Sequence, residues 1–186
     1  MSIFETYVTD LDGTLCDTLE ANVAAYRQAF QDIGLEFDEA AYRGNFGHRF
    51  DEMMSLIAPQ SSTDQRQQVA ERKSIHYPDH TNLVAINDNL VNVLWHAKRN
   101  GAKVGLATTA KERNARAILE HFNLTDLFDA TIFGEDVTNS KPDPECYQLV
   151  LQKLEATPET SVIFEDSVIG TEAACKTGAF VIKVAL

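Results

Sequence analysis

The chain has 186 residues, of which 44% are hydrophobic and 24% are charged, with only 9 Gly and 5 Pro. This composition is typical of a folded globular protein and leaves little room for long disordered segments. The formal net charge of -12 argues against bulk electrostatic binding to nucleic acid or to an anionic membrane, so a phosphate-bearing ligand requires local positive charge.

Five short runs rich in apolar and β-branched residues predict strands. The last four runs alternate with segments whose apolar residues recur at helical spacing. This alternation indicates an α/β protein with a parallel sheet covered on both faces. The predicted strands are residues 4–9, 103–107, 130–133, 161–164 and 180–184, and the predicted helices are residues 87–100, 112–122, 145–154 and 168–176.

A long segment, residues 10–102, separates the first predicted strand from the second. It contains no convincing strand but several amphipathic stretches, at residues 20–33, 49–57 and 63–77. Pro78 and its polar neighbours mark a turn region, after which the chain returns to the sheet. We therefore expect an inserted helical unit between the first two strands.

Polar residues follow the predicted strands at the positions where open parallel sheets bind ligands. Loops converge beyond the carboxyl ends of such strands, and helix amino termini present unpaired N–H groups there. The polar stretches in chain order are Asp-Leu-Asp-Gly-Thr at residues 10–14, Thr-Thr at 108–109, Ser-Lys-Pro at 140–142 and Glu-Asp-Ser at 165–167. These stretches hold the residue types that magnesium and phosphate chemistry needs.

Asp10 and Asp12 suit phosphoryl transfer. A carboxylate beside a turn that Gly13 permits can form an aspartyl-phosphate, which divides one difficult step into two. Asp12 can protonate the leaving alkoxide and later deprotonate the attacking water.

Positive charge must offset the repulsion between a carboxylate and a phosphate. Mg²⁺ prefers hard oxygen ligands, which suits Asp10 together with Asp166. Lys141 offers a second positive charge, and the hydroxyl group of Thr108 can donate to a phosphate oxygen. The backbone N–H groups that would complete the phosphate cradle are those near Leu11, Asp12 and Thr109.

Each polar stretch also has an ordinary structural explanation. Residues 10–13 can form a solvated turn, and Lys141 can be a surface lysine at a helix start. The pairs 108–109 and 165–166 can simply cap helices. The catalytic interpretation is favoured because the four stretches follow different strands in one order.

Four motifs together resemble those of the haloacid dehalogenase superfamily, in particular its phosphatases and its β-phosphoglucomutase-like branch. They are residues 10–18, 105–109, 140–144 and 164–167, the last continuing through Gly170 to Ala173 and Ala174. The resemblance covers the sheet-forming part almost from end to end. It implies a Rossmann-like parallel sheet core, residues 1–16 and 83–186, with an inserted α-helical cap domain, residues 17–82.

The resemblance also implies roles for the site residues. Asp10 would be the nucleophile and Asp12 the general acid and base. Mg²⁺ would be held by the Asp10 side chain, the Asp12 carbonyl group and Asp166, and Glu165 would support the metal or its waters. The cap would close over the substrate, exclude bulk water and decide which leaving group fits.

In the predicted cap, three residues are candidates for substrate binding. His48 and Arg49 fall where relatives carry a specificity loop, and the pair Arg72-Lys73 resembles a basic pair that touches substrate in the mutase-like branch. A charged pair on a helix is also typical of a solvated face, and His48 can equally be a structural histidine. The candidates are therefore His48, Arg49 and Lys73.

The sequence departs from the family pattern at two points. Thr9 stands where relatives commonly carry phenylalanine, which affects the packing behind Asp10. The chain also stops just after its last predicted strand, whereas many relatives continue. We expect the carboxy-terminal edge of the sheet either to be less well covered or to be completed by another subunit, in a monomer or a homodimer respectively.

Cysteine usage and the amino terminus predict a cytoplasmic protein. Cys16, Cys146 and Cys175 are far apart and form no CxxC pair, which argues against a disulfide framework or a cysteine zinc site. No basic stretch leads into an apolar run, and no apolar segment reaches 18 residues. We therefore expect no membrane partner and no nucleic-acid partner.

The leading hypothesis is a Mg²⁺-dependent phosphatase that hydrolyses a small phosphorylated metabolite, such as a sugar phosphate or a phosphoglycolate-like acid. The alternative is a β-phosphoglucomutase-like phosphomutase, in which a bound sugar phosphate receives the phosphoryl group. Dehalogenation fits less well, because Asp12 and the magnesium ligands serve phosphate chemistry. A non-catalytic binding protein would have lost the nucleophile or a metal ligand, and this chain retains both.

Overall fold

A computed structural model describes residues 4–46 and 50–186 of the chain. The chain forms two compact units, which we call the core unit (Met1–Asp17 and Ala85–Leu186) and the helical unit (Thr18–Val84). Within the described ranges, every helix is too short or too polar to span a lipid bilayer.

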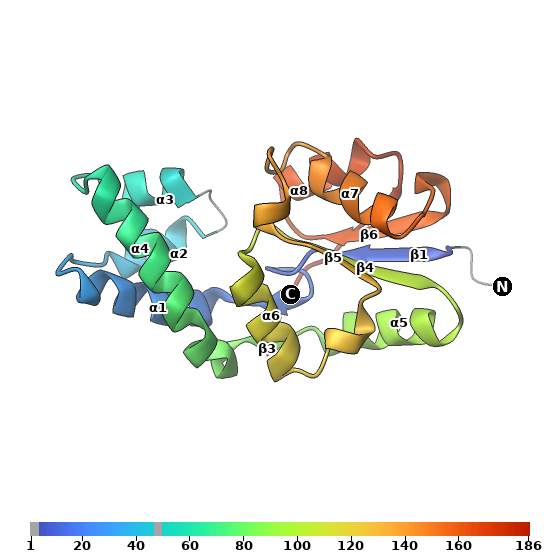
Figure 1. Cartoon of the computed structure of the whole chain (residues 1–186), viewed down its shortest axis with the longest axis horizontal. Coiled ribbons are helices and arrows are strands. Elements are labelled where there is room, and N and C mark those ends of the chain that lie inside the picture. The colour runs from blue at the N-terminus through green and yellow to red at the C-terminus, as the bar shows by residue number, and fades with distance from the viewer. Residues whose placement is uncertain (1–3, 47–49) are drawn as a thin grey trace. The chain divides into compact units, whose positions relative to one another are not determined.

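The core unit is built on a five-stranded parallel sheet (Figure 1). The strand order is β5-β4-β1-β6-β7, so β1 lies at the centre with a parallel neighbour on each side. The strands are β1 (Thr6–Thr9), β4 (Lys103–Ala107), β5 (Ala130–Ile132), β6 (Ser161–Glu165) and β7 (Phe180–Lys183). The predicted α/β class and the parallel sheet are confirmed.

Four helices of the core unit cover the two faces of this sheet (Figure 1). Helices α5 (Asp88–Arg99) and α6 (Glu112–His121) lie on one face, and α7 (Glu145–Lys153) and α8 (Val168–Cys175) lie on the other. This arrangement follows from right-handed crossovers that run outward from β1 in one direction and then in the other. The chain thereby creates a switch point beside β1, where open sheets bind ligands.

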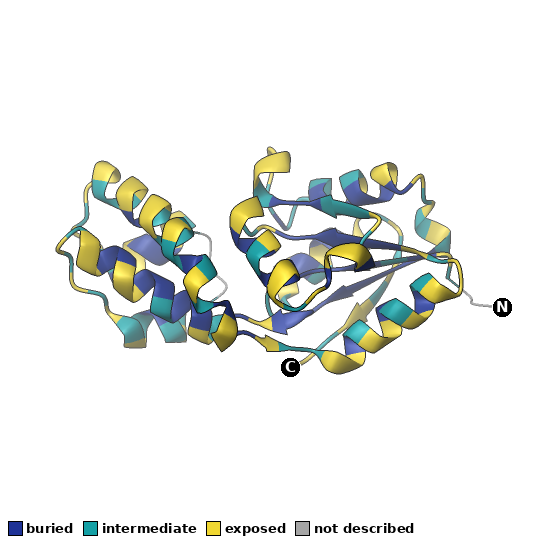
Figure 2. Ribbon diagram, turned by 60° about the horizontal axis from the view of Figure 1, so that its bottom comes forward, coloured by how far each residue is buried: buried dark blue, intermediate teal, exposed yellow. Residues whose placement is uncertain are grey.

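The core lies between the sheet and the helices (Figure 2). Val8 of β1 and Ile163 of β6 pack with Tyr147 and Val150 of α7 and with Ala173 of α8. The edge strand β7 is less well covered, and its Phe180 and Ile182 side chains are 57% and 46% exposed. A second subunit at this edge stays a prediction.

The helical unit contains four helices in the part of the chain that the structure describes. They are α1 (Leu19–Asp32), α2 (Glu39–Gly44), α3 (Phe50–Ile57) and α4 (Thr63–His76), and a 3-10 segment, Tyr77–Leu83, follows them. An apolar cluster that includes Phe30, Tyr42 and Met54 fills the space between the helices. Helix α2 was not predicted, because it makes fewer than two turns and its one buried residue is Tyr42.

The expectation of no strand between the first two sheet strands is wrong. Two-residue strands β2 (Cys16–Asp17) and β3 (Ala85–Ile86) pair in an antiparallel manner where the chain leaves and re-enters the core unit. Segments this short carry no alternating pattern that a sequence could reveal.

Asn87 fastens the returning chain to the loop that follows β1. Its side-chain oxygen accepts a hydrogen bond from Leu90 N at 3.2 Å and thereby caps α5, and its Nδ2 donates to the Thr14 carbonyl group at 3.1 Å. Its backbone N–H donates to the Leu15 carbonyl group at 2.9 Å. One side chain therefore links the start of a helix to the turn that carries Asp10 and Asp12.

Replacing Asn87 should destabilise the core unit. Asn87→Ala removes a helix cap and a link to Thr14, so we expect the free energy of unfolding to fall by about 1–2 kcal/mol. Asn82→Ala, at an exposed position in the 3-10 segment, is the matched control and should change it by less than about 0.5 kcal/mol. Urea denaturation measures both, and equal stabilities of the two variants would contradict the assigned role.

Candidate active site

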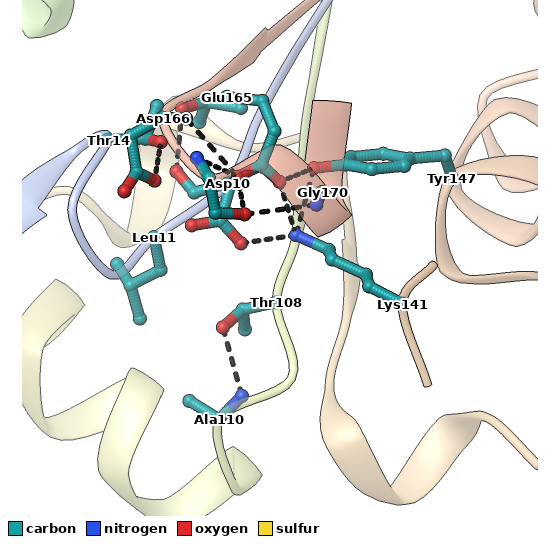
Figure 3. Close-up of polar contacts among 12 residues, drawn as sticks. Asp10, Leu11, Thr14, Thr108, Ala110, Lys141, Tyr147, Glu165, Asp166 and Gly170 are labelled. Carbon is teal, nitrogen blue, oxygen red and sulfur yellow. Dashed lines mark hydrogen bonds and ion pairs between the residues drawn. The ribbon is translucent and has the colours of Figure 1, made fainter. Parts of the chain in front are cut away.

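Residues from several loops meet at the carboxyl end of the sheet (Figure 3). Asp10 follows β1, and Glu165 ends β6 with Asp166 directly after it. Lys141 reaches them from the loop that precedes α7. Thr108 follows β4, and its hydroxyl oxygen accepts a hydrogen bond from Ala110 N at 3.0 Å. The loops that the sequence singled out therefore converge on one place.

The turn after β1 holds Asp166 beside Asp10. Gly13 has a φ of +88°, which favours glycine, and its N–H donates to the Cys16 carbonyl group at 2.8 Å. A Cβ atom on Gly13 would lie 2.4 Å from Asp166 Oδ2, so a larger residue would also displace this carboxylate. Thr14 Oγ1 donates to Asp166 Oδ1 at 2.7 Å. The turn therefore fixes Asp166 as well as Asp10.

The ammonium group of Lys141 joins the carboxylates. Its Nζ lies 2.6 Å from Asp10 Oδ1 and 2.7 Å from Glu165 Oε2. It also donates to the hydroxyl oxygen of Tyr147 at 2.9 Å. All of these groups are buried, with the side chains of Lys141, Asp10 and Glu165 only 5%, 8% and 1% exposed. Interactions between charges gain strength when water is kept away from them.

Glu165 is enclosed by hydrogen-bond donors. Its Oε2 accepts from Lys141 and Tyr147, while its Oε1 accepts from Ser167 Oγ at 2.9 Å and from the N–H groups of Ser167 and Asp166 at 3.1 and 3.2 Å. Helix α8 closes over it, because a Cβ atom on Gly170 would lie only 2.0 Å from Oε2. Both oxygen atoms of Glu165 are therefore already engaged by the protein.

Negative charge exceeds positive charge at this site. Burial raises the pKa of Asp10 to about 8, the neighbouring charges of Glu165 and Asp12 add to this effect, and Lys141 offsets it only in part. Burial also raises the pKa of Asp166. Burial opposes ionisation of Glu165 too, but Lys141 holds the pKa of this carboxyl below its usual value. Lys141 therefore offsets only part of the negative charge of Asp10 and Glu165, and a further cation would favour the ionised form of Asp10.

The oxygen atoms that surround this excess charge suit a metal ion. Asp10, Glu165 and Asp166 each offer a carboxylate oxygen, and these atoms all lie within 4.8 Å of one another. Asp10 and Asp166 each keep Oδ2 without a hydrogen bond from the described residues. A hard divalent cation such as Mg²⁺ takes one or two carboxylates of this kind and neutralises them. The donor set therefore fits magnesium.

The other candidate residues divide into three groups. Asp12 is half-buried in the turn after β1, Leu11 is fully buried so that only its backbone can meet a ligand, and Thr109 is exposed next to Thr108. Lys73 belongs to the helical unit, where its Nζ lies 4.2 Å from the centre of the Tyr77 ring. His48 and Arg49 lie outside the described residues.

A family model described as haloacid dehalogenase-like hydrolase matches residues 7–184. The chain belongs to the haloacid dehalogenase-like hydrolase family. The resemblance inferred from the four motifs and the expectation of a hydrolase of this family are thereby confirmed.

Similar proteins of this hydrolase family include enzymes named for phosphate removal. A phosphorylated carbohydrates phosphatase of Thermotoga maritima is 34% identical over 94% of this chain and 82% of its own length. A fructose-1-phosphate phosphatase of Escherichia coli is 27% identical over 99% of this chain and 100% of its own length.

Solved structures of CbbY from Rhodobacter sphaeroides resemble the whole chain. One, in complex with phosphate, is 25% identical with a TM-score of 0.87 and covers 98% of this chain and 87% of its own. A mutant of CbbY in complex with xylulose-(1,5)bisphosphate, also 25% identical and with the same coverage, has a TM-score of 0.86.

Two residues at the site of this haloacid dehalogenase-like hydrolase were not predicted. Thr14 was part of the first motif but had no role, and Tyr147 lay within the predicted helix 145–154 without a role. A signal for Tyr147 exists, because a buried tyrosine hydroxyl needs a hydrogen-bond partner and this one lies six residues after Lys141. The sequence does not say which partner it meets.

Removing the charge of Asp10 should stabilise the protein in excess chelator. The raised pKa of Asp10 means that its contribution to stability is full below about pH 4 and is lost as the pH rises through about 8. Asp10→Asn escapes this loss. At pH 8 we expect its Tm to exceed that of the wild type by at least about 3 °C, the effect of about 1 kcal/mol in a chain of this size, with little difference near pH 4.

Calorimetry with and without Mg²⁺ checks this expectation. Mg²⁺ should raise the Tm of the wild type more than that of Asp10→Asn, because a ligand stabilises the state that binds it. Asp126→Asn, at an exposed position, is the matched control and should behave as the wild type does. A lower Tm for Asp10→Asn than for the wild type at pH 8 in chelator would contradict the charge imbalance.

Proposed function

We propose that this haloacid dehalogenase-like hydrolase is a Mg²⁺-dependent phosphatase of small phosphorylated carbohydrates, with Asp10 as its nucleophile. The observation that carries the proposal is the buried carboxylate of Asp10 at the end of β1, held 2.6 Å from the Lys141 ammonium group and next to Asp166. The phosphatases of phosphorylated carbohydrates and of fructose 1-phosphate that this chain resembles support the substrate class.

Asp10 and Asp12 carry the chemistry in this proposal. Oδ2 of Asp10 attacks the phosphorus atom, the bond from phosphorus to the leaving oxygen breaks, and Asp12 gives that oxygen its proton. Asp12 then takes a proton from a water molecule that attacks the aspartyl-phosphate. The bond from Asp10 to phosphorus breaks, and inorganic phosphate leaves with the carboxylate restored.

Other residues of the site hold the reacting groups. Lys141 keeps Oδ1 of Asp10 turned away from the substrate, so that Oδ2 is the attacking atom. Thr108 receives a hydrogen bond from Ala110 and can donate its own hydrogen to a phosphoryl oxygen. We assign the N–H groups near Leu11, Asp12 and Thr109 to the same role. Mg²⁺, when held by Asp10, Asp166 and the Asp12 carbonyl group, supplies positive charge that stabilises the transition state.

The helical unit would determine which leaving group fits. We assign it the role of a cap, residues 17–82, flanked by core segments 1–16 and 83–186. The two-residue strands β2 and β3 pair where the chain leaves and re-enters the core unit, and such a short paired connection suits a hinge. In the cap, Lys73 keeps its ammonium group against the Tyr77 and Tyr26 rings, and we assign it, His48 and Arg49 to substrate binding.

Phosphate release from a panel of phosphorylated metabolites tests the proposed function. The panel contains sugar monophosphates, a sugar bisphosphate, phosphoglycolate and inorganic pyrophosphate. We expect turnover of one or more sugar phosphates in Mg²⁺ and none in excess chelator. Conversion of β-glucose 1-phosphate to glucose 6-phosphate without phosphate release would instead indicate a phosphomutase.

Loss of the nucleophile should abolish this turnover. Asp10→Asn removes the attacking carboxylate with little change in volume, so we expect kcat to fall by at least about a thousandfold. Asp126→Asn should retain full activity, because it changes an exposed aspartate that is not part of the site. Activity of Asp10→Asn within tenfold of the wild type would overturn the assignment of the nucleophile.

A further inference from the structure

Tyr147 is a buried residue that the phosphatase mechanism does not use directly. It lies in the first turn of α7, is 0% exposed, and belongs to the apolar cluster between the sheet and helices α7 and α8. The ring therefore has a sufficient structural reason to be there. The hydroxyl group does not, because a phenylalanine would fill the same space without a polar atom that needs a partner.

The hydroxyl group of Tyr147 bridges the side chains of Lys141 and Glu165. It donates its single hydrogen to Glu165 Oε2 at 2.5 Å and accepts from Lys141 Nζ at 2.9 Å (Figure 3). Lys141 Nζ in turn lies 2.7 Å from the same Oε2. Lys141, Tyr147 and Glu165 thus form a closed triangle of hydrogen bonds in which each group contacts the other two.

Together with Asp10, this triangle engages the hydrogen-bond donors of Lys141. An ammonium group has three donors, and here they go to Asp10, Glu165 and Tyr147. The ring of Tyr147 also presents a face to the ammonium group, with Nζ 4.7 Å from the ring centre. A long flexible lysine side chain is thereby held at three points, with little freedom to leave Asp10.

We propose that Tyr147 is a positioning residue, whose hydroxyl group acts with Glu165 to hold the ammonium group of Lys141 against Asp10. Glu165 orients Lys141 in this arrangement, and its own two oxygen atoms are held by five hydrogen bonds. Lys141 then acts on the nucleophile and fixes the orientation of its carboxylate. The catalytic consequence of this inference rests on the proposed function. The hydrogen-bonded triangle itself does not depend on that function.

The test removes the hydroxyl group of Tyr147 and keeps its ring. Tyr147→Phe keeps the buried ring and removes the hydroxyl group, whereas Tyr42→Phe removes a hydroxyl group from a buried tyrosine of the helical unit and is the matched control. With the substrate identified by the panel, we expect kcat of Tyr147→Phe to fall by about tenfold to a hundredfold while KM changes less than about threefold. Tyr42→Phe should match the wild type in both constants.

NMR spectroscopy reports on the position of the Lys141 ammonium group independently of enzyme activity. Held ammonium protons exchange slowly, so the wild type should show a resolved Lys141 signal in a ¹H–¹⁵N spectrum of lysine side chains, assigned by its loss in Lys141→Gln. The signal should broaden or vanish in Tyr147→Phe and persist in Tyr42→Phe. This measurement decides the positioning role even if the wild type releases phosphate from no compound in the panel, a result that would count against the proposed function alone.

Three outcomes would overturn the proposal. The first is a folded Tyr147→Phe protein with kcat within twofold of the wild type. The second is an unchanged Lys141 signal in that variant. The third is a wild-type spectrum with no slowly exchanging Lys141 signal, and this one applies even if Tyr147→Phe does not fold.

Discussion

One buried ammonium group holds the site of this haloacid dehalogenase-like hydrolase together. Lys141 pairs with Asp10 and Glu165, and these side chains are almost completely shielded from water. Removing Lys141 would leave two buried carboxylates without their cation, which is far more costly than losing a contact on the surface. The positions of β1, β6 and the loop before α7 therefore depend on one another.

The same interaction explains the affinity for a cation that the site should have. Lys141 supplies one positive charge, whereas Asp10, Asp12, Glu165 and Asp166 supply four carboxyl groups. Burial raises the pKa of Asp10 although Lys141 lowers it, whereas Lys141 and other hydrogen-bond donors keep the pKa of Glu165 below its usual value. A divalent cation held by Asp10 and Asp166 would reduce this imbalance and keep Asp10 charged, as its proposed role of nucleophile requires.

Two glycine residues let the backbone approach the carboxylates of the site closely. Gly13 and Gly170 stand where a Cβ atom would collide with the carboxylates of Asp166 and Glu165, respectively. Thr14 and Ser167 then supply hydroxyl groups to those same carboxylates. Glu165 at the end of β6 and Asp166 directly after it are thus each given room by a glycine and oriented by a hydroxyl group.

The sequence allowed the sheet and most of the site to be predicted, because both depend on order along the chain. Asp10, Thr108, Lys141 and Asp166 were found from their places after predicted strands, and parallel strands bring such residues to one edge. The contact between Tyr147 and Glu165 could not be found in this way. Periodicity tells which face of α7 is buried, but not which atom of another element a buried hydroxyl group will meet.

The short elements were missed for a related reason. Strands β2 and β3 have two residues each, and their pairing joins positions on either side of the helical unit. No local sequence pattern identifies two such short strands that lie so far apart in the chain. The substrate preference that we assign to the helical unit was equally hidden, since it would depend on the shape that several helices form together.

The most direct test of the account is a crystal structure of the protein with Mn²⁺ as an anomalous substitute for Mg²⁺. We expect one strong anomalous peak within bonding distance of a carboxylate oxygen of Asp10 and an oxygen atom of Asp166, with Lys141 still bound to Asp10, Tyr147 and Glu165. A peak elsewhere in the core unit, no peak at saturating Mn²⁺, or a metal that displaces Lys141 from Glu165 would contradict it.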